Sequence, residues 1–221
     1  MNKTDTIIIT CTSLARHVKV AQEKMGTDYQ VVGMARELHY HPKKMREKIL
    51  DTLEELPESI ENVLVGMGLC GGSWDLVVTP RRIVIPRMDD CITMLLHTDD
   101  TLHPVLKEKR HFYFRDSDRG MYSFAKRREE YEKKYGPKKA QRIMDIWFSY
   151  YTNANIIDTG AYDCREEGFM QVAKMSAAAM DCELGYVKGS NRVLEKLISG
   201  QWDEQFLVIE PGRVLLMEDF H

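Results

Sequence analysis

The chain has 221 residues, of which 43% are hydrophobic, and a formal net charge of −3. This length suits one large domain or two lobes of about 100 residues each. The slightly acidic balance gives no electrostatic reason to expect a nucleic-acid partner, and without a run of about 18 apolar residues we expect no membrane partner. The first residues, MNKTDTIIITC, hold too short an apolar segment for a secretory signal, which predicts a cytoplasmic protein.

Strand and helix patterns alternate through the first hundred residues. Short apolar or β-branched runs predict four strands, and helical spacing after residue 11 and after Pro42 predicts helices between them. The strands are expected over residues 6–10, 29–35, 62–70 and 81–88, and a helix is expected over 90–97. Because this alternation is typical of a mostly parallel sheet, residues 1–103 are interpreted as an N-terminal α/β lobe.

The rest of the chain predicts a helical segment and then a second α/β pattern. Residues 104–150 are charged and aromatic, and Gly136 with Pro137 divides them into two helices. Residues 151–221 alternate again and are interpreted as a C-terminal lobe. The fold class we predict is α/β, with two Rossmann-like lobes, mostly parallel sheets, a helical connector and a ligand cleft at the carboxyl edges of the strands.

Each predicted strand of the first lobe is followed by a residue that can bind a soft metal: Cys11, His39, Cys70 and Cys91 in chain order. The carboxyl ends of parallel strands share one edge of the sheet, where such folds bind ligands. Three thiolates and an imidazole can hold zinc, and three thiolates can hold an iron–sulfur cluster with an open position. The sequence therefore predicts a transition-metal site, with zinc and an iron–sulfur cluster as equal alternatives.

Neighbouring residues are predicted to support this site. Gly71 and Gly72 keep bulk away from the metal and join Asp90 in the predicted ligand-binding set. An aspartate at residue 89 or 90 suits the start of the following helix, and Asp89 is predicted to accept a hydrogen bond from the His39 ring and so to orient it towards the metal.

Alternatives to this ligand set remain open. His41 is a rival to His39, and Cys11 can instead be a lone nucleophile. Five cysteines in a cytosolic chain do not suggest a disulfide framework. Cys164 and Cys182 lie at the start of a predicted helix and of a predicted strand, and we interpret both as packing residues.

The second lobe offers a separate candidate site at Asp158, Thr159 and Gly160, where a strand ends before a loop. Loops of this kind followed by helix N-termini can hold an anion or a small polar ligand. The alternative is that the glycine only serves a left-handed turn.

The ordered set of these motifs resembles an uncharacterised domain family of anaerobic bacteria and methanogenic archaea, often encoded beside corrinoid-dependent methyltransferases. The resemblance covers residues 6–213 and is carried by Cys11, Leu38-His39 with Pro42, Gly68-Leu69-Cys70-Gly71, Pro86-Arg87 with Asp90-Cys91-Ile92, Asp158-Thr159-Gly160, Trp202-Asp203 with Phe206, and Pro211-Gly212. Asp89 and His97 are among the residues that depart from the pattern of the family. These departures argue against a shared substrate more than against a shared site.

The resemblance implies a metal- or cluster-binding protein of anaerobic one-carbon metabolism. A corrinoid is an implied further cofactor, and a corrinoid protein or methyltransferase is an implied partner. Two alternatives are a metallochaperone or corrinoid-delivery accessory protein, and a regulator that binds a small molecule without catalysis.

Overall fold

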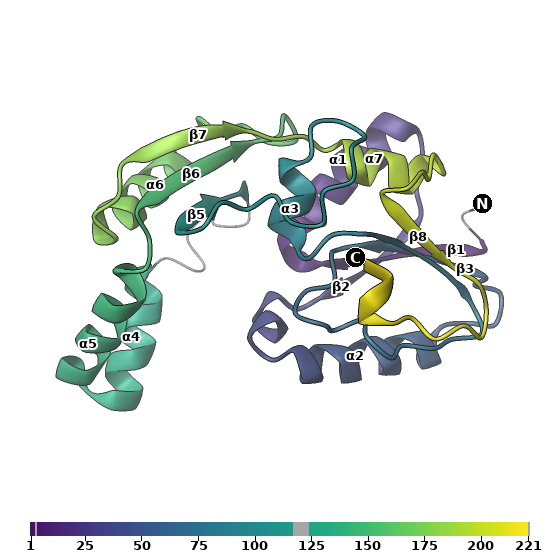
Figure 1. Cartoon of the computed structure of the whole chain (residues 1–221), viewed down its shortest axis with the longest axis horizontal. Coiled ribbons are helices and arrows are strands. Elements are labelled where there is room, and N and C mark those ends of the chain that lie inside the picture. Colours follow the sequence, from purple (N-terminus) through teal and green to yellow (C-terminus); the bar gives the residue numbers. More distant parts are fainter. Residues whose placement is uncertain (3, 117–123, 221) are drawn as a thin grey trace. The chain divides into compact units, whose positions relative to one another are not determined.

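The computed structural model describes the whole chain except residues 3, 117–123 and 221 (Figure 1). The described residues form two compact units. The first unit contains Met1–Leu106 together with Ser190–His221, and the second contains Lys107–Gly189.

A five-stranded sheet in the order β2-β1-β3-β4-β8 forms the centre of the first unit (Figure 1). The first four strands are parallel, and β8 runs antiparallel to β4. Since β1 lies between β2 and β3, the carboxyl ends of β1 and β3 mark the switch point at which open α/β sheets bind ligands. The strands are β1 (Thr6–Cys11), β2 (Gln30–Met34), β3 (Asn62–Gly66), β4 (Arg82–Pro86) and β8 (Phe206–Ile209).

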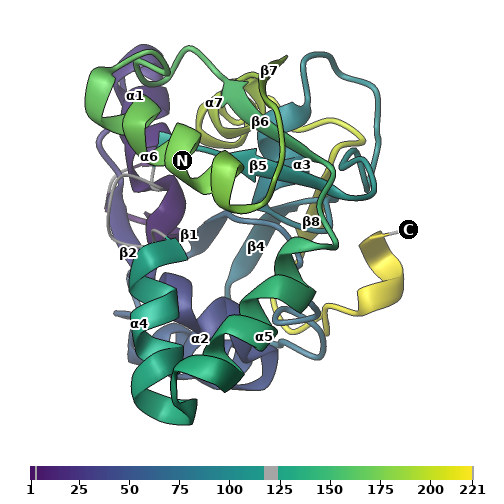
Figure 2. The ribbon, with the colours of Figure 1, turned by 90° about the vertical axis from the view of Figure 1, so that its left-hand side faces the viewer.

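Helices cover both faces of this sheet: α1 and α7 lie together on one face, and α2 lies on the other (Figures 1 and 2). Pro42 occupies the first turn of α2, and Gly26 and Gly200 take the left-handed conformation that ends α1 and α7. The elements are η1 (Thr12–Leu14), α1 (Ala15–Met25), η2 (Arg36–Tyr40), α2 (Pro42–Glu55), α3 (Cys91–Leu96), α7 (Arg192–Ser199) and η4 (Met217–Phe220).

The core of the first unit lies between this sheet and its helices. β1 and β3 are buried along their whole length. Strands that are covered on both faces need apolar residues at successive positions, which explains why the runs TIIIT and NVLV do not alternate with polar residues. None of the helices in the described part of the chain has the length and hydropathy needed to cross a membrane.

The second unit is built on a three-stranded parallel sheet in the order β5-β6-β7. Residues of α6 pack on one face of this sheet, and α4 and α5 pair as a hairpin. Gly136 has φ +79° and Pro137 begins α5, which is the break predicted from the Gly-Pro pair. The elements are β5 (His111–Phe114), α4 (Phe124–Tyr135), α5 (Pro137–Phe148), β6 (Asn153–Asp158), α6 (Glu167–Ala179) and β7 (Leu184–Lys188).

A buried arginine closes the amino edge of the larger sheet. Arg81 donates from Nε to the carbonyl oxygen of Ile60 at 3.1 Å and from Nη1 to that of Leu53 at 3.0 Å. Its Nη2 donates to the carbonyl oxygens of Leu56 at 2.6 Å and Pro57 at 3.3 Å. These are carbonyls at and just beyond the end of α2, where intrahelical partners run out, so Arg81 acts as a cap.

A buried lysine ties α7 to two loops. Lys196 Nζ donates to the carboxylates of Asp100 and Asp203 and, at 2.9 Å, to Gln205 Oε1. Trp202 Nε1 donates to the carbonyl oxygen of Leu197 at 2.9 Å. The late tryptophan–aspartate motif therefore has a structural role, because it holds the turn that leads into β8.

The predicted fold class is confirmed, since both sheets are mostly parallel and helices alternate with the strands. Three assignments differ from the prediction. The third strand ends at Gly66 and not at residue 70, because residues 67–70 run beside the loop after β4. The chain from residue 190 was assigned with 151–189 to a C-terminal lobe, but β8 pairs with β4 and α7 packs on α1 in the first unit. Residues 104–150 were interpreted as a connector, and α4 and α5 belong to the unit of β5-β6-β7.

Candidate functional site

Loops that follow the four parallel strands of the first unit lie against one another. The backbone N–H of Arg36, after β2, donates to Thr12 Oγ1, after β1, at 3.2 Å. The backbone N–H of Cys70, after β3, donates to the carbonyl oxygen of Asp89, after β4, at 2.7 Å. Positions that are distant in sequence are thus gathered at one edge of the sheet, as the alternating pattern predicts.

Cys11 is the last residue of β1 and is fully buried, with 0% of its surface exposed. Its side chain lies close enough to those of Cys91 and His39 for both to change its pKa, and Ser13 Oγ donates to its Sγ at 3.0 Å. The neighbouring Cys91 side chain and then burial raise the pKa of Cys11 from 9.0 to about 12, while His39 and Ser13 act in the opposite direction. Two adjacent buried thiols resist carrying two negative charges, so Cys11 stays protonated at neutral pH.

Cys91 is the first residue of α3 and is 2% exposed. The preceding Asp90 is the N-cap of this helix, where its carboxylate accepts the N–H groups of Ile92 and Thr93 at 3.0 and 2.9 Å. Asp89 Oδ1 accepts a hydrogen bond from Thr93 Oγ1 at 2.5 Å. The two aspartates therefore fix the start of the helix that carries Cys91.

His39 lies in η2, and its side chain is half-buried. Its Nδ1 atom is buried and makes no well-formed hydrogen bond within the described part of the chain. The side chain lies close enough to Cys11 to lower the pKa of that thiol. His41 is exposed just before α2, so of the two rival histidines the structure brings His39 to Cys11. The role of Asp89 as an acceptor for His39 stays a prediction.

Cys70 is 5% exposed and lies in a loop with unusual backbone geometry. It has φ +50°, and Gly71 and Gly72 follow at +71° and +85°. A Cβ at Gly71 would lie 3.1 Å from Pro42 Cγ, and Arg46 Nη2 donates to the carbonyl oxygen of Gly72 at 2.8 Å. The Cys70 thiol makes no hydrogen bond with any residue that the structure describes. The loop thus brings Cys70 to the same edge of the sheet, but its thiol makes no hydrogen bond with Cys11 or Cys91.

Gly68 explains part of the GLCG motif. A Cβ at this position would lie 2.7 Å from Asp90 Cα and 2.8 Å from both Asp90 N and Met88 O. All three are backbone atoms, so no side-chain rotation can make room. Only glycine lets the loop that carries Cys70 pass this close to the loop that carries Cys91.

The predicted ligand-binding residues of the last third belong to the second unit. Asp158 ends β6, and its carboxylate lies 3.5 Å from Arg165 Nη1. Thr159 Oγ1 accepts the N–H of Ala161 at 3.3 Å, and Gly160 has φ +73°. The carboxylate of Glu166 accepts two backbone N–H groups at the start of α6, each at 3.0 Å. The backbone N–H groups at the start of α6 were expected to bind an external anion. The Glu166 carboxylate of the chain itself occupies them instead.

Cys164 and Cys182 lie in the hydrophobic core of the second unit, as their interpretation as packing residues expects. Burial is the largest cause that raises the pKa of each thiol, and the nearby carboxylates of Asp158 and Asp181 act in the same direction. Both thiols are therefore inert core groups at neutral pH.

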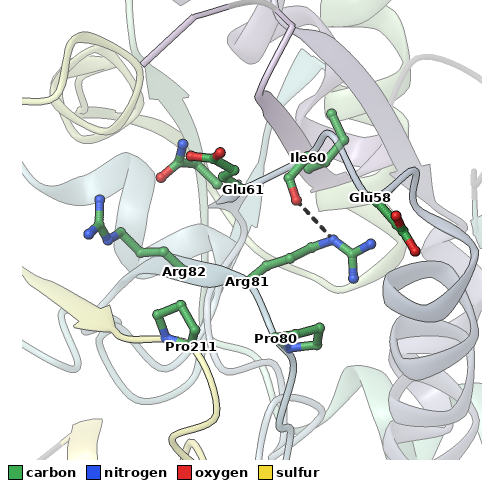
Figure 3. A pocket seen from close by; sticks show the side chains of 8 residues that line it. Glu58, Ile60, Glu61, Pro80, Arg81, Arg82 and Pro211 are labelled. Atoms are coloured by element: carbon green, nitrogen blue, oxygen red, sulfur yellow. Dashed lines mark hydrogen bonds between the residues drawn. The ribbon is translucent and has the colours of Figure 1, made fainter.

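A pocket of about 480 Å³ opens at the amino edge of the larger sheet (Figure 3). Figure 3 shows Arg81 Nε directed at the carbonyl oxygen of Ile60. Arg82, on the other side of the pocket, lies 3.3 Å from Glu210 Oε1. Both cations already have protein partners, so we assign no ligand to this pocket.

The donors at the carboxyl edge suit a soft metal, although the side chains are not arranged around one. Within the described residues, no three His, Cys, Asp or Glu side chains are already placed so that they can hold a metal ion. The contact of Cys11 with Cys91 and His39 supplies the soft donor types that zinc and iron–sulfur clusters use. The sequence prediction missed Ser13 and Arg46, because neither belongs to a motif. Their contacts with Cys11 and with the Gly72 carbonyl become visible only in the folded structure.

The fold and these residues define a Rossmann-like α/β protein with buried thiols at the carboxyl edge of its larger sheet. Residues 34–198, well over half of the chain, match the family described as "Protein of unknown function (DUF1638)", and the chain belongs to this family. The matched range includes His39, Cys70 and Cys91. Comparisons with curated proteins and with solved structures found no match.

Proposed function

We propose that this protein binds a transition metal or an iron–sulfur cluster through Cys11, Cys91 and His39, with Cys70 as a further ligand. The observation that carries the proposal is the contact of the buried Cys11 side chain with both Cys91 and His39. Thiolate and imidazole are the donors of zinc sites, and thiolates are the donors of iron–sulfur clusters.

Electrostatics favours a cation at this position. Without one, a second thiolate beside the first is penalised, and the pKa of Cys11 is raised to about 12. A bound metal ion reverses that penalty, because its positive charge stabilises both thiolates at once. Binding should therefore release the Cys11 proton, and affinity should rise with pH over the neutral range.

Cys70 is the ligand that must move. Its thiol is free of hydrogen bonds within the described chain, and two glycines follow it directly. Glycine adopts many backbone conformations at little cost, so this loop can shift towards the Cys11–Cys91 pair. When bound, the metal would supply Lewis-acid or redox chemistry at the switch point of the sheet.

The metabolic setting that we propose is anaerobic one-carbon metabolism, with methyl transfer from corrinoids and a corrinoid protein or methyltransferase as the partner. The support for this setting is the sequence resemblance, which spans residues 6–213. The position of the thiols at a carboxyl edge suits a small-molecule ligand as well.

Delivery of a metal or corrinoid is the second candidate function. The observation that favours it is that the Cys70 thiol, unlike those of Cys11 and Cys91, makes no hydrogen bond or electrostatic contact in the described chain. A ligand on a movable loop can be exchanged for a ligand of an acceptor protein. Turnover of a methylated corrinoid by the loaded protein would favour an enzyme, and stoichiometric transfer to a corrinoid protein would favour delivery.

The direct test is metal analysis of the full chain after anaerobic purification, followed by titration with Zn²⁺ and Co²⁺. We expect about one metal ion or cluster per chain, and a thiolate-to-metal charge-transfer band in the near ultraviolet for Co²⁺. The variants Cys11→Ser and Cys91→Ser should each weaken metal binding by more than about 100-fold, because changing a residue that only hydrogen-bonds to a ligand already costs about 10–100-fold.

Matched controls lie in the same chain. Cys164→Ser and Cys182→Ser alter thiols of the second unit and should leave metal binding unchanged, and His41→Gln is the control for His39→Gln. Metal-free protein that takes up neither ion, or Cys11→Ser and Cys164→Ser variants that bind equally well, would overturn the proposal and favour a regulator whose cysteines only pack.

A further inference from the structure

A pocket of about 280 Å³ lies in the second unit, where α4 and α5 face α6. We propose that it is a second ligand site, independent of the thiols, for a small amphipathic anion such as an aromatic carboxylic acid of one or two rings. The argument rests on its apolar walls, an unpartnered hydroxyl and an arginine with free donors.

The walls of the pocket are apolar. Phe124 and Met144 are buried members of the core of this unit, and Phe148 and Val172 are half-buried beside them. Met175 also lines the pocket and is 63% exposed, which places it at the opening. Walls of this kind gain free energy when an apolar group displaces water from them.

Ser176 places a hydroxyl in these apolar surroundings. The residue is 6% exposed and lines the pocket. Its backbone carbonyl accepts the N–H of Met180 at 3.3 Å, but its hydroxyl makes no hydrogen bond with any described residue. Because no described residue takes up this hydroxyl, it is available to a ligand that enters the pocket. A polar atom of a ligand in the pocket would satisfy it.

Arg128 selects the sign of the ligand charge. Its Nε donates to Glu132 Oε1 at 2.9 Å, in an exposed pair one helical turn apart. Neither Nη group has a partner within the described chain. Exposed ion pairs of this kind stabilise a helix by only a few tenths of a kcal/mol. Glu132 therefore does not prevent the Arg128 guanidinium from binding a ligand carboxylate through two parallel hydrogen bonds.

The remaining polar residue of the pocket is Gln141. Its Nε2 donates to Asp145 Oδ1 at 2.6 Å, which directs the amide N–H towards its own helix. The lining thus combines an apolar body, one hydroxyl and one cation. A volume of about 280 Å³ holds a compact ligand of roughly a dozen heavy atoms, below the size of typical drug-like ligands.

The test is calorimetric titration of the full chain with 2-naphthoate and with its neutral isostere 2-naphthamide. We expect saturable binding of one molecule per chain, with naphthoate about tenfold tighter because of the charge-assisted contact to Arg128. Arg128→Gln should remove this preference and leave the affinity for naphthamide unchanged. Arg142→Gln, which alters an arginine of α5 that does not line the pocket, should change neither affinity.

Filling the pocket completes the test. Val172→Trp and Ala179→Phe should each abolish binding of both probes, while the near-ultraviolet circular dichroism shows that the variant is folded. Two filling variants are used so that one that fails to fold does not decide the outcome. Absence of saturable naphthoate binding, or binding that a folded filling variant retains, would overturn the site, and equal loss for both probes in Arg128→Gln would overturn the anion preference.

Discussion

The buried Cys11 thiol should make the folded chain lose stability at alkaline pH, and Cys11→Ala should remove that loss. The folded chain keeps the Cys11 proton up to a pKa of about 12, whereas the exposed thiol of the unfolded chain loses it near 9.0. Between these values the unfolded state binds fewer protons, so rising pH favours unfolding. The stability present below pH 9 is lost as the pH rises towards 12.

The size of the effect follows from the two pKa values. A single group contributes about 1.4 kcal/mol per pH unit where only the unfolded state is ionised. From pH 8 to pH 10 the unfolded thiol becomes largely ionised while the folded thiol does not. The free energy of unfolding should therefore fall by about 1.4 kcal/mol more in the wild type than in Cys11→Ala.

The assay is urea unfolding of both proteins at pH 8 and pH 10, under anaerobic conditions with a phosphine reductant and a chelator. The cavity left by Cys11→Ala lowers stability at both pH values, so it cancels in the comparison. Ionisation of tyrosines and lysines cancels for the same reason. Equal losses in the two proteins, within about 0.3 kcal/mol, would refute the argument that Cys91 and burial hold the Cys11 proton.

Three further substitutions, measured by urea unfolding, test the close backbone contact at Gly68, the helix cap at Arg81 and the buried ion pairs of Lys196. Gly68→Ala places a methyl group 2.7 Å from Asp90 Cα, and should lower the free energy of unfolding by about 2–3 kcal/mol and weaken metal binding. Arg81→Met leaves four backbone carbonyls without their donor and should cost about 3 kcal/mol. Lys196→Met removes the cation that Asp100 and Asp203 share and should cost about 2 kcal/mol.

Each substitution has a matched control. Gly168→Ala adds a methyl group whose nearest neighbour is the flexible Glu166 carboxylate, so it should be tolerated. Arg82→Met and Lys24→Met remove cations from exposed ion pairs and should each cost less than about 1 kcal/mol. A tolerated Gly68→Ala, or an Arg81→Met variant no less stable than Arg82→Met, would contradict the corresponding argument.

The sequence predicts the strands of the first unit well because burial on both faces of β1 and β3 demands apolar runs. The sequence also shows helix ends where a single residue decides them, as at Pro42 and Gly200. It does not show that β8 crosses back to pair with β4, because an antiparallel edge strand at the end of the chain can pair with any open edge. The assignment of residues 190–221 to a second lobe failed for this reason.

The candidate site was predictable to the level of its loops and not to the level of its atoms. The rule that parallel strands share a carboxyl edge brings Cys11, Cys70 and Cys91 to one region. It cannot show that the side chains of Cys91 and His39 reach Cys11 while that of Cys70 makes no such contact, because that depends on the backbone angles after residue 67. Ser13 was missed because its hydrogen bond to Cys11 follows from a single 3₁₀ turn that no motif marks.

The left-handed backbone at Cys70 is the feature that links the loop to the proposed function. A non-glycine residue with φ +50° is disfavoured by about 1–2 kcal/mol, and a glycine at this position would avoid that cost. The loop keeps a cysteine there although Gly71 and Gly72 follow directly, and the thiol forms no hydrogen bond in the described chain. The proposed metal site gives this position a role for its thiol as a further ligand. On that proposal, Cys70→Gly should stabilise the metal-free chain and weaken its binding of the metal.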